Sequence, residues 1–204
     1  MVVVVNVRFQ ILTEIPSENL RNQIVRIWQG NVEAGAALGA RQGDPLSRYE
    51  EMLAAHELAM SSGNGLLIVM ADAGADSNND AGADGFGTVL GFAWWILGIP
   101  EGKPRHIATV KRLQVDRNRR GEKLGRLLLD YVHSPEVLSL LPAEVEFLHL
   151  QFRSGEGLGQ LYAQYGYEVN VRWDFIRKND GGEYDGWIEM IRTRSGAALP
   201  EIQL

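Results

Sequence analysis

The sequence predicts an α/β (α+β) fold in which a mixed, mostly antiparallel sheet of about seven strands is flanked by about four helices. Apolar segments of strand length recur along the whole chain, and the helical segments between them carry their own start and stop signals. Three of these apolar segments follow one another through turns alone, which indicates an antiparallel meander. Because the 204 residues show no boundary and no repeat, we expect a single domain over residues 1–204.

Caps and turn residues define the predicted elements. Ser17 and Ser154 are the expected N-caps of two helices. Asp44 as N-cap and Pro45 as first helical residue predict another helix, and Gly166 is expected to end the last helix in a left-handed conformation. In chain order, the predicted elements are a strand over 2–12, helices over 18–32 and 46–60, strands over 66–71, 88–97 and 105–115, a helix over 124–131, a short helical turn over 135–141, a strand over 144–152, a helix over 155–165, and strands over 167–176 and 185–194.

The stretch from Asp72 to Gly87 is low in complexity and consists mainly of Gly, Ala, Asp and Asn. Its acidic and amide residues alternate as in a calcium loop, but Ala81 stands where the required glycine should be and Gly87 where the terminal glutamate should be. We therefore interpret residues 72–87 as a flexible hairpin insertion, and we expect no metal. Residues 195–204 are expected to form a loose tail.

Composition limits the classes of function. The hydrophobic content is 45% and the charged content 23%, as in ordinary soluble globular proteins. The absence of cysteine excludes disulfides, thiolate metal ligands and a cysteine nucleophile, and it fits the reducing cytoplasm that we expect. The apolar N-terminus lacks the charged region and cleavage pattern of an export signal, and no segment is long and apolar enough to cross a membrane. The net charge of −6 argues against broad nucleic-acid binding.

The positive charge is concentrated around one predicted strand-to-helix junction, between Lys103 and Arg126. The chain has 20 Lys and Arg against 26 Asp and Glu, yet nine of those 20 basic residues lie together in this region. They are Lys103, Arg105, Lys111, Arg112, Arg117, Arg119, Arg120, Lys123 and Arg126. A helix N-terminus after a basic loop presents backbone N–H groups and a partial positive charge, so we expect this junction to bind an anion such as phosphate.

Two motifs carry a resemblance to a known family. The first is Arg120-Gly-Glu-Lys-Leu-Gly125, which is similar to a Gln/Arg-x-x-Gly-x-Gly/Ala loop, and the second is Tyr162-Ala-Gln-Tyr165-Gly166-Tyr167 in the last predicted helix. In this order and with one strand between them, they resemble the GNAT superfamily of N-acetyltransferases over residues 66–194. The N-terminal third looks, more loosely, like the tabtoxin-resistance acetyltransferases.

The resemblance implies acetyl-CoA as cosubstrate and a set of residues that bind it. The loop would hold the pyrophosphate through backbone N–H groups and basic side chains, and the end of the preceding strand would pair with the pantetheine arm. The implied residues are Leu113, Gln114 and Val115 on the strand, and Arg120, Gly121, Glu122, Lys123, Leu124, Gly125 and Arg126 on the loop and helix start. Lys123 stands at the family's middle glycine, so the backbone there must accept a side chain. Ser154-Gly155 replaces the family's usual asparagine, and we assign no CoA contact to it.

Tyr162 matches the family's general acid. A tyrosine hydroxyl, with a pKa of about 10, can protonate a leaving thiolate whose thiol has a pKa of about 8.5. The alternative is that Tyr162 packs in the core. The base is left open, because several residues of suitable type are present and a water chain could also serve. The candidates are Glu33, His106, Glu146, His149 and Asp174.

The expected function is transfer of an acetyl group to a primary amine of a small molecule by direct attack in a ternary complex. An acidic surface would attract a cationic acceptor. Two alternatives remain, a protein N-terminal or lysine acetyltransferase and a non-catalytic acyl-CoA sensor. Trp94 and Trp95 point to opposite faces of their strand, so at most one would face an acceptor, and the core is the default for both. We expect no nucleic-acid or membrane partner, and a monomer or homodimer.

Overall fold

The computed structural model describes residues 6–33, 43–73, 87–98, 104–154, 157–178 and 184–200, with the backbone alone at 174–178 and 184–185. The chain divides into two compact units. Unit 1 comprises Met1–Ile96 and Arg112–Leu140, and unit 2 comprises Leu97–Lys111 and Leu141–Leu204.

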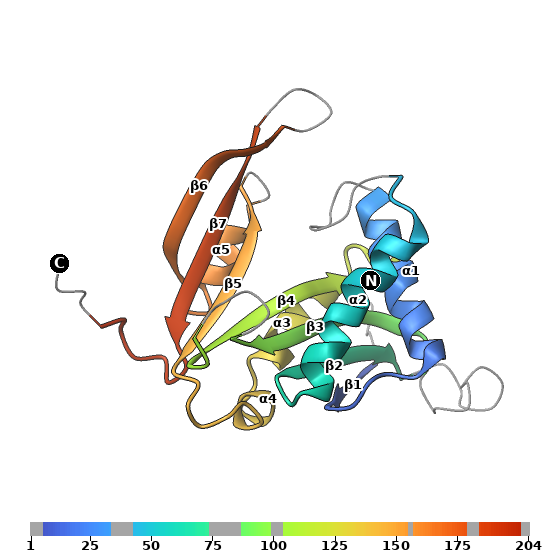
Figure 1. Cartoon of the computed structure of the whole chain (residues 1–204), viewed down its shortest axis with the longest axis horizontal. Coiled ribbons are helices and arrows are strands. Elements are labelled where there is room, and N and C mark those ends of the chain that lie inside the picture. Colours follow the sequence, from blue (N-terminus) through green and yellow to red (C-terminus); the bar gives the residue numbers. More distant parts are fainter. Residues whose placement is uncertain are drawn as a thin grey trace. The chain divides into compact units, whose positions relative to one another are not determined.

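The strands form a seven-stranded sheet in the order β1-β2-β3-β4-β5-β7-β6 (Figure 1). The strands are β1 (Val7–Leu12), β2 (Gly65–Asp72), β3 (Val89–Leu97), β4 (Ile107–Val115), β5 (Phe147–Arg153), β6 (Glu168–Lys178) and β7 (Tyr184–Thr193). β4 and β5 pair in parallel, whereas β1 with β2, β2 with β3, β5 with β7 and β6 with β7 are antiparallel. The predicted mixed, mostly antiparallel sheet of about seven strands is thereby confirmed.

The described residues form five α-helices and one 3-10 helix (Figure 1). They are α1 (Glu18–Glu33), α2 (Leu46–Ser61), η1 (Arg117–Arg119), α3 (Leu124–Val132), α4 (Pro135–Ser139) and α5 (Leu158–Ala163). No helix among the described residues is long and apolar enough to cross a membrane.

The core of unit 1 lies between its sheet and helices α1 and α2. Trp28 of α1 and Trp94 of β3 are fully buried, and the Trp28 ring meets Tyr49 of α2 edge-on at 5.9 Å. Trp95 points to the opposite face of β3, as period-two alternation requires, and its Nε1 donates to the carbonyl oxygen of Val132 in α3 at 3.1 Å. Helices therefore cover both faces of this part of the sheet, and the expectation that both tryptophans are core residues is confirmed.

Of the three N-caps predicted from the sequence, one is present in the structure and two are not. Ser17 caps α1, because its Oγ accepts from the backbone N–H of Leu20 at 3.3 Å. The cap position of α2 is Pro45 rather than the expected Asp44, and it makes no side-chain cap bond. The expected cap Ser154 is also wrong: α5 begins after Gly157, whose φ is 69°, and the cap position makes no side-chain bond.

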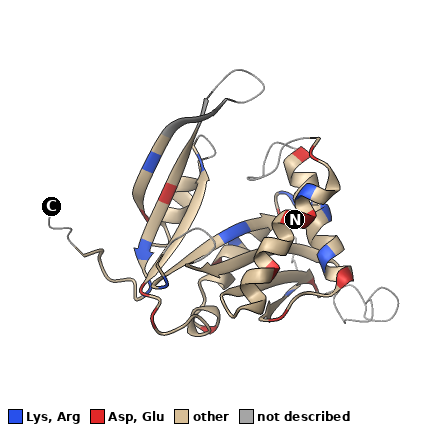
Figure 2. Cartoon of the chain, in the orientation of Figure 1, with Lys and Arg blue, Asp and Glu red and all other residues tan. Residues whose placement is uncertain are grey.

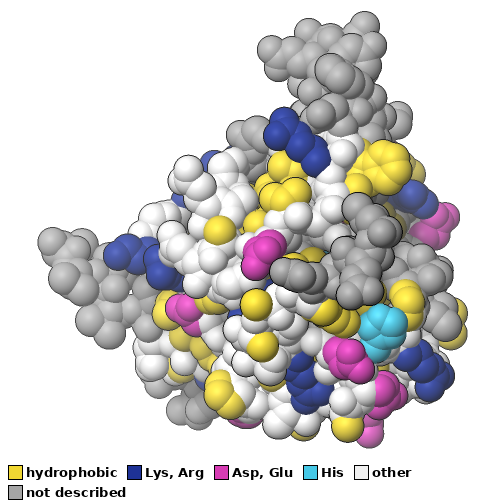
Figure 3. All heavy atoms as spheres, turned by 90° about the vertical axis from the view of Figure 1, so that its left-hand side faces the viewer, with side chains coloured by type: hydrophobic (Ala, Val, Ile, Leu, Met, Phe, Trp, Pro, Cys, Tyr) yellow, Lys and Arg dark blue, Asp and Glu magenta, His cyan; other side chains and the backbone are white. Residues whose placement is uncertain are grey.

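Unit 2 contains the first part of β4, the strands β5, β7 and β6, and helix α5. The α5 helix packs on one face of β5, where the ring of Phe152 lies 5.3 Å from that of Tyr162. Gly166 follows this helix with φ of 80°, which confirms the expected left-handed residue. Val169 and Trp173 on the edge strand β6 are 60% and 55% exposed, and hydrophobic side chains are visible among basic ones from this side (Figure 3).

Several predicted features lie outside the described residues. They are the start of the first strand at 2–5, the centre of the insertion at 74–86, the turn at 179–182, and the last residues of the tail at 201–204. Residues 195–200 form neither helix nor strand. The single domain over residues 1–204 remains a prediction.

Candidate functional site

The basic loop links β4 to α3 through a short 3-10 turn and two left-handed residues. Asp116 caps η1, since its Oδ1 accepts from the backbone N–H of Asn118 at 2.9 Å. Gly121 then has φ of 91° and Lys123 has φ of 59°, and α3 begins at the next residue. The position of the family's middle glycine is thus left-handed, a conformation that a lysine tolerates at some cost in free energy.

The start of α3 offers a group of free backbone donors. The N–H groups of Gly121, Lys123, Leu124 and Gly125 have no hydrogen-bond partner within the described part of the chain. Leu124 anchors the helix, because its side chain is only 2% exposed. The side chains of Arg120, Lys123 and Arg126 are exposed around these donors. Four free N–H groups at a helix start with three exposed basic side chains form an arrangement that can bind a phosphate.

Two further charged residues of the loop are engaged within the protein. Arg119 Nε donates to Glu122 Oε1 at 2.6 Å, and Arg119 Nη1 lies 3.4 Å from Asp72 Oδ2. The hydrogen bond that Arg119 donates to Glu122 is the main cause that raises the pKa of Arg119 above its usual value. The backbone N–H of Glu122 donates to the carbonyl of Arg119. This ion pair fixes the loop, and it leaves Arg120, Lys123 and Arg126 as the basic groups open to a ligand.

β4 changes conformation just before the loop. Its pairing with β5 runs from Ile107 to Val110, and Arg112 then takes φ of 52°, in the left-handed region. A non-glycine residue with positive φ inside a strand is uncommon and turns the backbone. The guanidinium of Arg112 lies 4.9 Å above the ring of Trp28, which holds this turn against α1. No residue in this stretch predicts the turn, because arginine does not favour positive φ.

The residues predicted to pair with the pantetheine arm, Leu113, Gln114 and Val115, follow this turn in β4. Gln114 is buried, and its Oε1 accepts from Asn31 Nδ2 of α1 at 3.1 Å. The same amide nitrogen donates to the carbonyl oxygen of Val115 at 3.0 Å. Leu113 is half-buried. Asn31 was not singled out in the sequence, although it fixes the strand end from which the basic loop begins.

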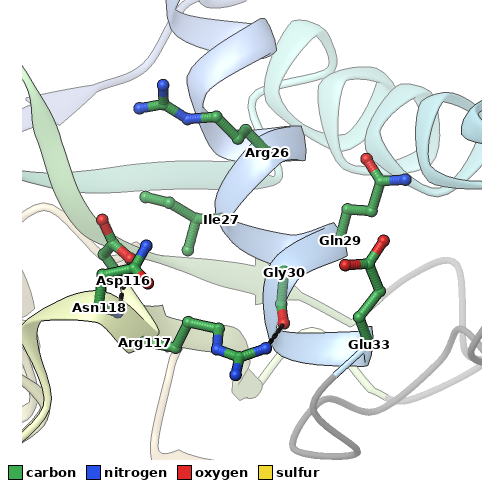
Figure 4. A pocket seen from close by; sticks show the side chains of 8 residues that line it. All are labelled: Arg26, Ile27, Gln29, Gly30, Glu33, Asp116, Arg117 and Asn118. Atoms are coloured by element: carbon green, nitrogen blue, oxygen red, sulfur yellow. Dashed lines mark hydrogen bonds between the residues drawn. The ribbon is translucent and has the colours of Figure 1, made fainter.

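A surface pocket of about 460 Å³ lies between α1 and the end of β4 (Figure 4). In this view Arg117 extends from η1 to α1, where its Nη1 donates to the carbonyl oxygen of Gly30 at 3.1 Å. The pocket has two arginines and two carboxylates in its wall, so it can hold polar groups of either sign. Its lining residues are Arg26, Ile27, Gln29, Gly30, Glu33, Asp116, Arg117 and Asn118.

Tyr162 belongs to unit 2 and lies on α5. Its side chain is partly buried, with its ring 5.3 Å from Phe152 and 6.4 Å from Tyr167. Tyr167 is 2% exposed, and burial raises its pKa well above the usual value for tyrosine. Tyr162 and Tyr167 of the second motif therefore differ: Tyr167 is a core residue, and Tyr162 is not fully enclosed.

A hydrogen-bonded network crosses β4, β5 and β7 on the other face of the unit 2 sheet. His149 of β5 is 1% exposed, and its Nδ1 lies 3.1 Å from Thr109 Oγ1 and its Nε2 3.1 Å from Glu189 Oε2. Glu189 lies near the middle of β7, which spans Tyr184–Thr193. Figure 2 shows acidic and basic residues on the strands of this part of the sheet. Its Oε1 accepts from Gln151 Nε2 at 2.6 Å, and Lys111 Nζ donates to Gln151 Oε1 at 3.2 Å.

The other candidate bases take no part in the hydrogen bonds given above for the described side chains of this network. Glu146 and His106 are exposed and lie just before their strands, and the backbone N–H of Glu146 donates to the carbonyl of His106. Glu33 lines the pocket beside α1. The side chain of Asp174 lies outside the described residues. Among the described residues, no group of three or more acidic or histidine side chains is placed to hold a metal ion.

Comparison with known proteins rests on structure. No protein-family model matches the chain, and no curated protein matches it. A protein from Salmonella typhimurium, described as an acetyltransferase and solved with its cofactor acetyl-CoA, is 16% identical with a TM-score of 0.65, and the match covers 95% of this chain and 98% of that one. An acetyltransferase of the GNAT family from Streptococcus pneumoniae is 15% identical with a TM-score of 0.61, covering 91% and 99% of the two chains. The chain has the GNAT fold.

A further GNAT-fold neighbour is the ribosomal-protein-S18-alanine N-acetyltransferase from Escherichia coli, which is 15% identical with a TM-score of 0.61. That match covers 97% of this chain and 99% of the other. The expected GNAT resemblance is therefore confirmed at the level of the fold. The narrower resemblance to tabtoxin-resistance acetyltransferases gains no support from these neighbours.

Proposed function

We propose that the protein is an acetyl-CoA-dependent N-acetyltransferase that transfers the acetyl group to a primary amine of a small molecule. The observation that carries the proposal is the start of α3, where four backbone N–H groups without a partner in the described chain lie among three exposed basic side chains. Acetyl-CoA carries a pyrophosphate, which such a helix start binds through charge-assisted hydrogen bonds. A GNAT-fold neighbour solved with acetyl-CoA supports this choice of ligand.

In this proposal one segment of the chain binds the cofactor and another donates a proton. The loop from Arg120 to Arg126 holds the pyrophosphate, and the backbone of Leu113–Val115 pairs with the pantetheine arm. Tyr162 donates its proton to the sulfur as the C–S bond breaks. The amine attacks the thioester carbon directly, so no covalent enzyme intermediate forms, which suits a chain without cysteine.

The test is the binding of acetyl-CoA, measured by calorimetry. We expect micromolar affinity, no measurable binding of S-acetylpantetheine, which lacks the pyrophosphate, and retained binding of desulfo-CoA. Arg120→Ala should weaken binding roughly 10- to 100-fold, the size of one hydrogen bond between charged groups. Arg105→Ala removes an exposed arginine outside the loop and is the matched control, with unchanged affinity expected. No binding at millimolar acetyl-CoA would overturn the proposal.

A second acceptor class has a specific observation in its favour. One GNAT-fold neighbour is an enzyme that acts on the alanine of a ribosomal protein. A screen that compares tyramine and spermidine with an alanine-initiated peptide separates the two classes. We expect the small amines to be turned over, and turnover of the peptide alone would make the protein an N-terminal acetyltransferase.

A further inference from the structure

We infer that Glu189 takes the proton from the acceptor amine, and that His149 and Gln151 are positioning residues that hold its carboxylate. The inference rests on the proposed N-acetyltransferase activity and names a proton acceptor for it. The sequence alone left the base open and did not point to Glu189, because the network that holds Glu189 is assembled from three different strands.

The carboxylate of Glu189 is held at both oxygens and is still accessible. Oε1 accepts from Gln151 Nε2 at 2.6 Å, and Oε2 lies 3.1 Å from His149 Nε2. The Glu189 side chain is 16% exposed, whereas that of His149 is 2% exposed. Glu189 can therefore meet a substrate, and His149 acts through it.

The outer members of the network determine how the inner ones are oriented. The ammonium of Lys111 donates to Gln151 Oε1, so the amide must present its Nε2 to Glu189. A carboxylate accepts only, so Nε2 of a neutral His149 carries the proton and Nδ1 accepts from the hydroxyl of Thr109. With the directions of these hydrogen bonds fixed, the carboxylate is preorganised for one task.

Glu189 and Tyr162 lie on opposite sides of the same short piece of β5. Gln151, which binds Glu189, and Phe152, whose ring packs on Tyr162, are consecutive residues. Consecutive side chains of a strand point to opposite faces, and their Cα atoms are about 3.8 Å apart. The pairing of β5 with β4 ends one residue earlier, at Leu150. A thioester bound along this edge of β5 would have the proposed proton donor on one face and the proposed acceptor on the other.

The proposed steps balance. The ammonium of the acceptor gives one proton to Glu189, which releases it to water. The amine lone pair then forms the C–N bond, the C–S bond breaks, and its electron pair leaves on sulfur. Tyr162 protonates the sulfur, and the second proton lost by nitrogen restores the tyrosine through solvent. The products are the N-acetyl amine, CoA and one released proton.

The test is the kinetics of Glu189→Gln with acetyl-CoA and whichever of tyramine, spermidine and an alanine-initiated peptide the wild type turns over. We expect kcat to fall about 10²- to 10⁴-fold, the usual contribution of a general base. The calorimetric affinity for acetyl-CoA should not change, because Glu189 lies outside the proposed cofactor loop. Glu168→Gln is the matched control: it removes an exposed carboxylate from β6 of the same sheet, and its kcat should equal that of the wild type.

Conservative variants separate a positioning role from a role in folding. Glu189→Asp keeps the charge but shortens the side chain, and it should lower kcat without changing the KM for acetyl-CoA. His149→Gln keeps a donor towards Glu189 and should retain more kcat than His149→Leu, which keeps none. A wild-type kcat in Glu189→Gln would overturn this inference and leave the transferase proposal standing. If Glu189→Gln does not fold, a wild-type kcat in Glu189→Asp would do the same. A wild type that binds acetyl-CoA but acetylates none of the three probes would overturn it together with the transferase proposal.

Discussion

Asn31 on α1 holds the last residue of β4, since its Nδ2 donates to the carbonyl oxygen of Val115 at 3.0 Å. The same nitrogen donates to Gln114 Oε1 at 3.1 Å, so both protons of the amide are used. The Asn31 side chain is buried at 7% exposure, where an unpaired polar group would be costly. One side chain therefore connects helix α1 to the strand end that leads into the basic loop.

Asn31→Leu should lower the free energy of unfolding by about 1–3 kcal/mol, because it leaves a buried acceptor on Gln114 and a part-buried one on Val115 without their donor while keeping the approximate volume of the side chain. Urea denaturation measures the change. Asn22→Leu, at an exposed position of the same helix, is the control and should stay within about 0.5 kcal/mol of the wild type. Equal stability of the two variants would mean that water replaces the lost bonds.

Lys123 has a left-handed backbone at the start of α3, with φ of 59° and ψ of 20°. A residue with a Cβ loses about 1–2 kcal/mol in this region, and glycine does not. Lys123→Gly should therefore be about 1 kcal/mol more stable than Lys123→Ala, although both variants lose the same charge. Thermal or urea unfolding of the pair gives the difference directly. If the alanine variant were the more stable one, the left-handed conformation would not be the native one at this residue.

The parts of the site that were predicted from sequence are those that are local in the chain. The loop from Arg120 to Gly125 is one continuous segment, and its charge and glycine spacing are visible without knowledge of the fold. Gly166 was predicted for the same reason, because a left-handed residue after a helix is a property of a few neighbouring residues.

The remaining features depend on which residues the sheet brings together. Ser154 has the residue type of an N-cap, but its Oγ accepts from the backbone N–H of Gly186 across the sheet at 2.8 Å. His149 was visible as a candidate, whereas its partner Glu189 is 40 residues away and becomes a neighbour only through the register of β5 with β7. Period-two alternation assigns faces within one strand, and it does not tell which residue of another strand lies opposite.

Tyr167 makes the free energy of unfolding depend on pH in the alkaline range. Burial is the main cause that raises its pKa above the value of about 10 for an unfolded chain, so the folded state keeps the proton longer than the unfolded state does. The contribution of protonated Tyr167 to the free energy of unfolding is fully present below about pH 10. It is lost at about 1.4 kcal/mol per pH unit as the pH rises further. Tyr167→Phe should remove this part of the slope. The measurement is urea unfolding of both proteins from pH 9 upward, and parallel curves would contradict the assignment.

Tyr162→Phe separates an enzyme from a protein that only binds acyl-CoA. The change removes one hydroxyl and keeps the ring that packs on Phe152, so the fold and the affinity for acetyl-CoA should not change. If Tyr162 protonates the leaving sulfur, kcat should fall about 10²- to 10⁴-fold. Tyr165→Phe, three residues further along the chain, removes a hydroxyl to which no role in the reaction is assigned, and its kcat should equal that of the wild type. Equal losses of kcat in both variants would mean that the effect comes from packing. Binding of acetyl-CoA without turnover by the wild type would favour an acyl-CoA sensor.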